Sequence, residues 1–233
     1  MTVELWFLTL LTINNYGRYL KKFDGIIFDI DGTLTETNNL IFASFNHVAQ
    51  KYWGKTLTPE EITKYFGPTE QTIFKQLFKE HFDEVMEDYY KFYRKNHKLM
   101  AKAFDGIPEL ISELKTRGIL LSIYTGKGRT TSLITLEEIG LIDKFDMIVS
   151  GDDIKGHKPS PEGIELFIKK YNLKRYKVLM VGDAPPDIKA ARAAGIKIAS
   201  VLWDSYAKDE VLKMNSDFYF KKVEELKKFL LKE

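Results

Sequence analysis

The sequence contains no cysteine in its 233 residues. This absence excludes disulfide bonds, thiolate metal sites and cysteine nucleophiles. A chain without cysteine also fits a reducing compartment, so we expect a cytoplasmic protein.

An excess of charge of one sign is missing as well. The chain has 35 Lys and Arg residues against 33 Asp and Glu residues, which gives a formal net charge of +2. Nucleic-acid binding usually depends on a clustered basic surface, so the balance of charge argues against a nucleic-acid partner.

Long hydrophobic runs are also absent. The most apolar segment near the start, residues 5–13, is far shorter than the roughly 20 residues that span a membrane. It lacks the basic flank and the small-residue cleavage site of a signal peptide. We therefore expect no membrane partner, and we interpret residues 1–21 as an N-terminal extension.

The sequence does have a regular alternation of short apolar runs with segments of helical periodicity. This pattern is typical of a parallel sheet with crossover helices. Because 44% of the residues are hydrophobic, the chain can build a sizeable core. Strands are predicted in residues 23–30, 118–126, 145–153, 176–184 and 197–204. Helices are predicted between them, in residues 107–118, 160–173 and 185–195.

Residues 38–103 have a different pattern, in which amphipathic helices follow one another without a convincing strand. We predict an α/β fold: a Rossmann-like parallel sheet core with helices on both faces, and a small all-α cap inserted after the first core strand. The predicted core comprises residues 22–37 and 104–233, and the predicted cap comprises residues 38–103.

Polar groups follow the predicted strands at the point where each strand ends. In open parallel sheets, ligands bind outside the carboxyl ends of the strands, so these groups should meet at one rim. They are Asp29 and Asp31 after the first strand, Thr125 and Gly126 after the second, Lys158 after the third, and Asp183 with Asp187 after the fourth.

Several carboxylates at one rim repel one another, and a hard divalent cation removes that conflict. An open site rich in oxygen suits Mg²⁺. A lysine and a Thr-Gly turn provide cationic and N–H donors that suit a phosphate. Without cysteine, a carboxylate is the natural nucleophile. These residues indicate Mg²⁺-dependent phosphoryl transfer through an aspartyl phosphate.

Four short motifs resemble those of the haloacid dehalogenase superfamily. "FDIDGTLT" is similar to its first motif, "YTG" to its second, "HKPSP" to its third and "GDAPPD" to its fourth, in the family's order. The helical insertion resembles the C1-type cap, and the whole layout resembles phosphoglycolate phosphatases. The resemblance implies a hydrolase with this fold and a Mg²⁺ cofactor.

The resemblance also implies roles for the aspartates. Asp29 would be the nucleophile and a metal ligand. Asp31 would be the general acid and base, with its main-chain carbonyl on the metal. Asp183 would complete the protein ligands of Mg²⁺. Asp187 would orient either a metal-bound water or the motif lysine.

For the phosphate, the resemblance implies that Thr125 and the Gly126 N–H hold the phosphoryl oxygens. Lys158 would stabilise the phosphoryl charge and hold the nucleophile. The second motif often continues with Asn in the family, whereas Gly126 and Lys127 stand here. We expect Lys127 to be a solvated lysine.

One departure from the family and one open segment concern the surroundings of the site. Ala184 stands where the family often has a hydroxyl residue, which removes a hydroxyl near the metal but no charge. Gly67-Pro68 interrupts two predicted cap helices. A loop that faces the substrate and a plain interhelical turn are both open interpretations of this pair.

The sequence thus predicts a Mg²⁺-dependent phosphatase that hydrolyses a small phosphate monoester, phosphoglycolate-like, through an aspartyl phosphate. Its partner would be a small phosphorylated metabolite, and either a monomer or a homodimer is compatible with the sequence. The alternatives are a sugar phosphomutase of the β-phosphoglucomutase type, an inorganic pyrophosphatase, and a non-catalytic phosphate-binding protein.

Overall fold

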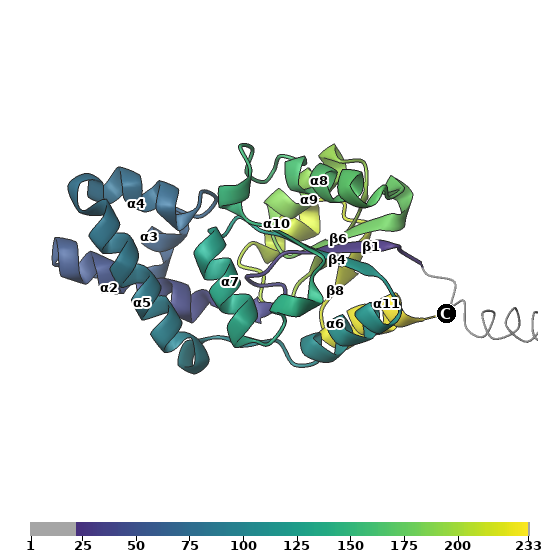
Figure 1. The fold of residues 1–233 in the computed structure, drawn as a ribbon, viewed down its shortest axis with the longest axis horizontal. Coiled ribbons are helices and arrows are strands. Elements are labelled where there is room, and N and C mark those ends of the chain that lie inside the picture. Colours follow the sequence, from purple (N-terminus) through teal and green to yellow (C-terminus); the bar gives the residue numbers. More distant parts are fainter. Residues whose placement is uncertain (1–21, 233) are drawn as a thin grey trace, which may run out of the picture.

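A computed structural model describes residues 22–232 of the chain, and the predicted N-terminal extension lies outside them. The chain forms an α/β core and a helical cap that lies beside it (Figure 1). The cap is inserted between the first and second strands of the core sheet, β1 (Gly25–Phe28) and β4 (Leu120–Tyr124).

The core sheet has six strands in the order β5-β4-β1-β6-β7-β8, and all neighbouring strands are parallel. β1 lies in the middle, where its Gly25 pairs with Leu120 on one side and Val178 on the other. The remaining strands are β5 (Met147–Val149), β6 (Val178–Gly182), β7 (Lys197–Val201) and β8 (Phe218–Phe220). After β5 the chain returns to the other side of β1, so the strand order reverses beside it, where such sheets bind ligands.

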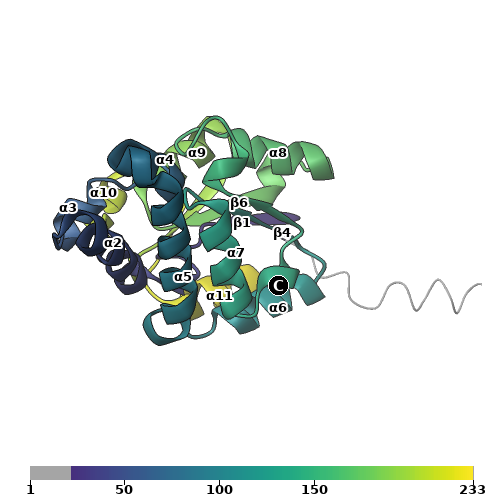
Figure 2. The same cartoon turned by 60° about the vertical axis from the view of Figure 1, so that its left-hand side comes forward.

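Alternate residues of the strands face opposite sides of the sheet and fill two separate cores. Ile26 and Phe28 pack with the helices on one face, and Ile27 packs with those on the other. Figure 2 shows the two helical layers. The first layer contains α6 (Ile107–Thr116), α7 (Arg129–Glu138) and α11 (Val223–Leu231); the second contains α8 (Glu162–Tyr171), α9 (Pro185–Ala193) and α10 (Lys208–Lys213).

The cap has its own aromatic core, in which Phe45, Phe74 and Tyr89 form edge-to-face contacts. Its helices are α2 (Asn38–Trp53), α3 (Pro59–Thr63), α4 (Glu70–Phe78) and α5 (Phe82–Met100). Two chain segments connect cap and core, and they form the antiparallel ribbon of β2 (Thr35–Glu36) and β3 (Lys102–Ala103). Short 3₁₀ turns complete the structure at Lys79–His81, Ile142–Lys144, Gly151–Asp153 and Arg175–Lys177.

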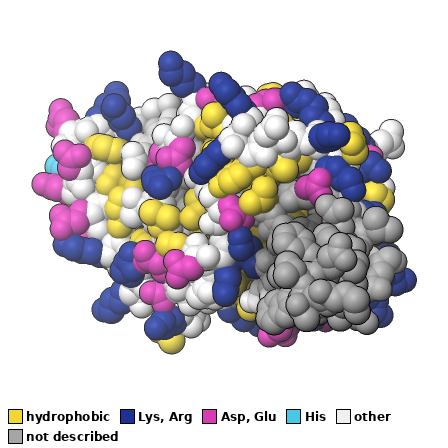
Figure 3. Space-filling view, turned by 45° about the vertical axis from the view of Figure 1, so that its right-hand side comes forward, with side chains coloured by type: hydrophobic (Ala, Val, Ile, Leu, Met, Phe, Trp, Pro, Cys, Tyr) yellow, Lys and Arg dark blue, Asp and Glu magenta, His cyan; other side chains and the backbone are white. Residues whose placement is uncertain are grey.

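The structure confirms the predicted fold class, and each predicted core strand is present. It adds the edge strand β8, which the sequence analysis missed. Among residues 22–232, no helix is both long enough and apolar enough to cross a membrane. Basic and acidic side chains are interspersed on the face shown in Figure 3.

Candidate active site

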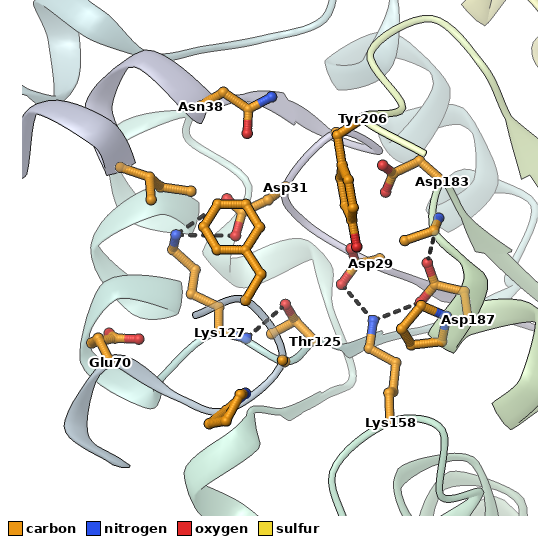
Figure 4. A pocket seen from close by; sticks show the side chains of 18 of the residues that line it. Asp29, Asp31, Asn38, Glu70, Thr125, Lys127, Lys158, Asp183, Asp187 and Tyr206 are labelled. Carbon is orange, nitrogen blue, oxygen red and sulfur yellow. Dashed lines mark hydrogen bonds and ion pairs between the residues drawn. The ribbon is translucent and has the colours of Figure 1, made fainter. Parts of the chain in front are cut away.

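All of the predicted site residues line one pocket, which lies at the carboxyl ends of the central strands and faces the cap (Figure 4). Asp29 directly follows β1, Thr125 follows β4 and Asp183 follows β6. Lys158 comes from the loop before α8, and Asp187 lies in the first turn of α9. The core sheet therefore brings together residues that are up to 158 positions apart, from Asp29 to Asp187.

Three buried carboxylates form the centre of the site. Asp29, Asp183 and Asp187 each place an oxygen within 4.8 Å of the others. Thr33 Oγ1 donates a hydrogen bond of 3.1 Å to Asp183 Oδ1. Gly32 has φ of +76°, and a Cβ atom there would lie 2.6 Å from Asp183 Oδ2. The glycine of the first motif is therefore required both by backbone conformation and by space.

Burial and mutual repulsion make the charged forms of this cluster costly. Burial raises the pKa of Asp29, and the charges of Asp187 and Asp31 add to that effect, although Lys158 opposes it. Burial raises the pKa of Asp183 well above its usual range, and the charges of Asp29 and Asp187 raise it further. Hard carboxylate oxygens that face one another in this way fit a divalent cation such as Mg²⁺, which would neutralise them.

Lys158 connects two members of the cluster. Its Nζ lies 2.8 Å from Asp29 Oδ1 and 2.6 Å from Asp187 Oδ1. Burial lowers the pKa of Lys158, but the two aspartates more than reverse that effect, so the ammonium group stays charged. The Tyr124 hydroxyl donates a hydrogen bond of 2.8 Å to the Ser160 carbonyl, which holds the lysine's loop against the sheet.

The Thr125-Gly126 turn lies beside these charges. The Thr125 N–H donates a hydrogen bond of 3.0 Å to the Val149 carbonyl, so the turn continues directly from the sheet. The Thr125 side chain is buried, and its Oγ1 accepts a hydrogen bond of 3.2 Å from the Lys127 N–H. A hydroxyl and the Gly126 N–H at a strand end suit an anionic oxygen.

Asp31 is oriented differently from the other aspartates. Its carboxylate points towards the cap (Figure 4), where both oxygens lie 3.1 Å from Lys127 Nζ. The Thr37 hydroxyl donates a further hydrogen bond of 2.5 Å to Asp31 Oδ1. The Lys127 side chain is only 5% exposed. The expectation of a solvated Lys127 was therefore wrong, because Asp31 draws the ammonium group into the pocket.

The wall opposite the carboxylates is mainly apolar and comes from the cap. The pocket encloses about 160 Å³. Gly67 and Pro68 line it, and a Cβ atom on Gly126 would lie 3.4 Å from the Gly67 carbonyl oxygen. Of the two open interpretations of Gly67-Pro68, the geometry favours the loop that faces the site. The other apolar cap residues of this wall are Ile41, Phe45, Phe66, Ile73 and Tyr89.

Three site residues were missed or misjudged from the sequence. Besides Lys127, the buried Glu70 of the cap accepts hydrogen bonds from the Gly128 N–H at 2.9 Å and from the Thr131 hydroxyl at 2.5 Å. Tyr206 lies at the pocket beside Phe66, with ring centroids 6.0 Å apart. The signal for Glu70 was its place at the start of a helix, but nothing in the sequence shows which core loop it meets.

Comparison with protein families gives a match over most of the core and cap. The family model described as haloacid dehalogenase-like hydrolase matches residues 26–201. Pyrophosphatase PpaX of Bacillus pumilus is 34% identical over 201 residues, which cover 86% of this chain and 93% of that protein. Pyrophosphatase PpaX of Anoxybacillus flavithermus is 33% identical, with 86% and 94% of the two chains covered.

Solved structures agree with this match at the level of the fold. A predicted phosphoglycolate phosphatase from Haemophilus somnus superposes with a TM-score of 0.80 at 19% identity, covering 90% of this chain and 99% of that chain. A haloacid dehalogenase-like family hydrolase from Streptococcus pneumoniae gives a TM-score of 0.72 at 22% identity, with 89% and 98% covered.

Proposed function

Because the chain belongs to the haloacid dehalogenase-like hydrolase family, we propose that it is a Mg²⁺-dependent phosphatase that hydrolyses a small phosphate ester through an aspartyl phosphate. The observation that carries this proposal is the placement of Asp29. Its carboxylate lies at the base of the pocket, paired with Lys158 and grouped with two further buried carboxylates.

In the first step, an oxygen of Asp29 attacks the phosphorus atom. A bond forms between that oxygen and phosphorus, and the bond between phosphorus and the leaving oxygen breaks. Asp31 gives a proton to the leaving oxygen. The Thr125 hydroxyl, the Gly126 N–H and the Lys158 ammonium group, which line the pocket, would bind the other phosphoryl oxygens and stabilise their charge.

In the second step, water attacks the phosphorus atom of the aspartyl phosphate. Asp31, now ionised, takes a proton from that water, and the bond between phosphorus and the Asp29 oxygen breaks. Phosphate leaves and Asp29 is regenerated, so the two steps consume one ester and one water and release one alcohol and one phosphate. Asp187 holds Lys158 in place through both steps.

The cation would be held by the carboxylates of Asp29 and Asp183 and by the main-chain carbonyl of Asp31, with Asp187 behind them. When bound, Mg²⁺ supplies positive charge that offsets the repulsion between Asp29 and the phosphoryl oxygens. Without a cation, an anionic substrate would meet a cluster whose charges repel it.

The size of the pocket favours a small substrate. A cavity of about 150 Å³ in another protein holds one benzene molecule. The 160 Å³ pocket of this protein therefore leaves room for a phosphoryl group and a few further atoms. A small phosphorylated metabolite such as phosphoglycolate fits this space. We place this activity in the cytoplasm, as expected for a substrate of this kind.

A second candidate is pyrophosphate, because the curated relatives that match over 86% of this chain are named pyrophosphatases. The same residues would cut an anhydride in place of an ester bond. Phosphate is a better leaving group than an alcohol, so the reaction would depend less on proton donation by Asp31 in the first step.

The test is release of inorganic phosphate with and without Mg²⁺ from p-nitrophenyl phosphate, phosphoglycolate, sugar phosphates, nucleotides and pyrophosphate. We expect release that requires Mg²⁺ and that falls by more than about 10³-fold in Asp29→Asn, because the variant lacks the nucleophile. The preferred compound identifies the substrate class. Release that is unaffected by Asp29→Asn would overturn the proposal.

A further inference from the structure

We infer that Lys127 is a positioning residue that holds the Asp31 carboxylate in the orientation in which it exchanges protons with the substrate and with water. This inference rests on the proposed function, because it takes Asp31 as the group that exchanges protons. It concerns an ion pair at the border of core and cap, on the other side of the pocket from the cluster of buried carboxylates.

The contacts of Lys127 are directed at Asp31 alone among the aspartates of the pocket. Its Nζ lies 3.1 Å from each oxygen of the Asp31 carboxylate. With Oδ1 also receiving the Thr37 hydroxyl, the carboxylate is held from two sides. Lys158, the other lysine of the pocket, contacts Asp29 and Asp187 instead. Each lysine of the pocket thus pairs with different aspartates.

The cap encloses this ion pair. The Lys127 ammonium group lies 4.9 Å from the centre of the buried Tyr93 ring, over its face. Tyr93 is fixed in turn by a 2.9 Å hydrogen bond between its hydroxyl and that of Thr135 in α7. An aromatic face attracts a cation, so the Tyr93 ring helps to hold the ammonium group beside the Asp31 carboxylate.

The position of Lys127 also connects the ion pair to the phosphate-binding turn. The Lys127 N–H donates a hydrogen bond of 3.2 Å to Thr125 Oγ1, and Gly126 lies between these two residues in the sequence. The turn that would hold the phosphoryl oxygens therefore also sets the place of the lysine that holds Asp31. Because one loop carries both the turn and Lys127, the lysine would set the orientation of Asp31 relative to a phosphoryl group bound at that turn.

Asp31 would exchange protons in both steps, so loss of the group that orients it should slow each step that needs such an exchange. With an aryl phosphate the leaving oxygen needs no proton, and only the attack of water then depends on Asp31. With such a substrate we therefore expect loss of Lys127 to slow the second step far more than the first.

The experiment compares wild type with Lys127→Met and Lys127→Arg by stopped-flow kinetics on p-nitrophenyl phosphate with Mg²⁺. Its aryl leaving group needs no proton, so the first turnover reports formation of the aspartyl phosphate. In Lys127→Met we expect the first turnover to stay within about tenfold of wild type while steady turnover falls by about 100-fold, the lower end for acid–base catalysis. A burst of p-nitrophenolate should appear, and acid-quenched enzyme should carry a phosphoryl group.

Two further variants separate positioning from other roles. Lys127→Arg keeps the charge and should restore part of the steady rate. In the Asp31→Asn background, Lys127→Met should cost less than about threefold, because residues that act as a unit have non-additive effects. Thermal melts check that each variant is folded. If Lys127→Met is unfolded, the first turnover and the steady turnover are compared in Lys127→Arg and Lys127→Gln instead.

The outcomes are distinguishable from failure of the proposed function. Wild type that releases no phosphate from any ester would overturn the proposed function itself. Active wild type, with first turnover and steady turnover reduced equally in Lys127→Met, would overturn the inference and indicate that Lys127 binds the phosphoryl group. Additive losses in the double variant would overturn it as well.

Discussion

At the scale of single residues, the aspartates of the site differ in their hydrogen-bonding partners. Asp29 and Asp187 both pair with Lys158, and Asp31 pairs with Lys127. Within the part of the chain that the structure describes, the Asp183 carboxylate has one side-chain partner, the hydroxyl of Thr33. Asp183 is therefore the buried carboxylate with no lysine partner, and its charge is the one that most needs a cation.

This difference predicts how Mg²⁺ affects stability. We expect saturating Mg²⁺, at about 100 times its dissociation constant, to raise the free energy of unfolding of wild type by about 2.7 kcal/mol. In Asp183→Asn the increase should disappear, while stability without Mg²⁺ should not fall, because the substitution removes a repelled charge. Chemical denaturation with and without Mg²⁺ measures both quantities.

The matched control is Asp204→Asn. Asp204 is also an acidic residue of the pocket, but it lies outside the group of three close carboxylates. It should keep the response of wild type to Mg²⁺. An equal response in Asp183→Asn and wild type would show that the cation binds elsewhere.

At the scale of elements, the sequence predicted the parts of the fold that depend on local pattern. The central strands are buried on both faces, so each is a continuous apolar run. β8 was missed because it is a short edge strand in which Phe218 is half-buried and Tyr219 is 37% exposed. Most motif residues were predicted because they lie where such a run ends or the next helix begins: Asp29, Thr125 and Asp183 directly follow a strand, and Asp187 lies in the first turn of α9. Lys158 was predicted from its motif, since it lies in the loop before α8.

The contacts between elements could not be predicted in the same way. The Lys127–Asp31 pair joins two loops 96 positions apart, and Glu70 meets a loop 58 positions away. The Glu70 contact depends on how the cap docks on the core, and the Lys127–Asp31 pair depends on how two loops of the core direct their side chains. No local pattern records either. Charge alone made Lys127 look like a surface residue, since lysine is almost never buried without a partner.

The docking contact of Glu70 gives a prediction at this scale. Its carboxylate lies at the start of α7, where it accepts hydrogen bonds from Gly128 and Thr131 and where a negative charge is favourable. Glu70→Gln should lower the free energy of unfolding by about 1–3 kcal/mol, the cost of weakening buried hydrogen bonds to a charged group. It should also raise KM more than it lowers kcat, because the loop at Gly67-Pro68 that lines the pocket is then less firmly placed.

Glu80→Gln is the control for that prediction, since Glu80 is an exposed glutamate just beyond α4, the helix that begins with Glu70. It should change stability by less than about 0.5 kcal/mol, as most surface substitutions do. If Glu70→Gln behaves like Glu80→Gln, the contact does not hold the cap to the core.

At the scale of the whole molecule, core and cap together form the pocket. The core places Asp29 and Asp183 at the ends of the central strands and Lys158 in the loop before α8. The cap adds a mainly apolar wall, which in the proposed function would help to exclude bulk water from the reaction. The ribbon of β2 and β3 is the connection through which the cap is attached to the core.

The most direct test of this account is detection of the phosphoryl group on Asp29. Enzyme that is turning over p-nitrophenyl phosphate with Mg²⁺ is quenched in acid, and its peptides are analysed by mass spectrometry. The account predicts one added phosphoryl group on the peptide that contains Asp29, removed by hydroxylamine and absent from Asp29→Asn. A phosphoryl group on another residue, or full turnover by Asp29→Asn, would contradict it.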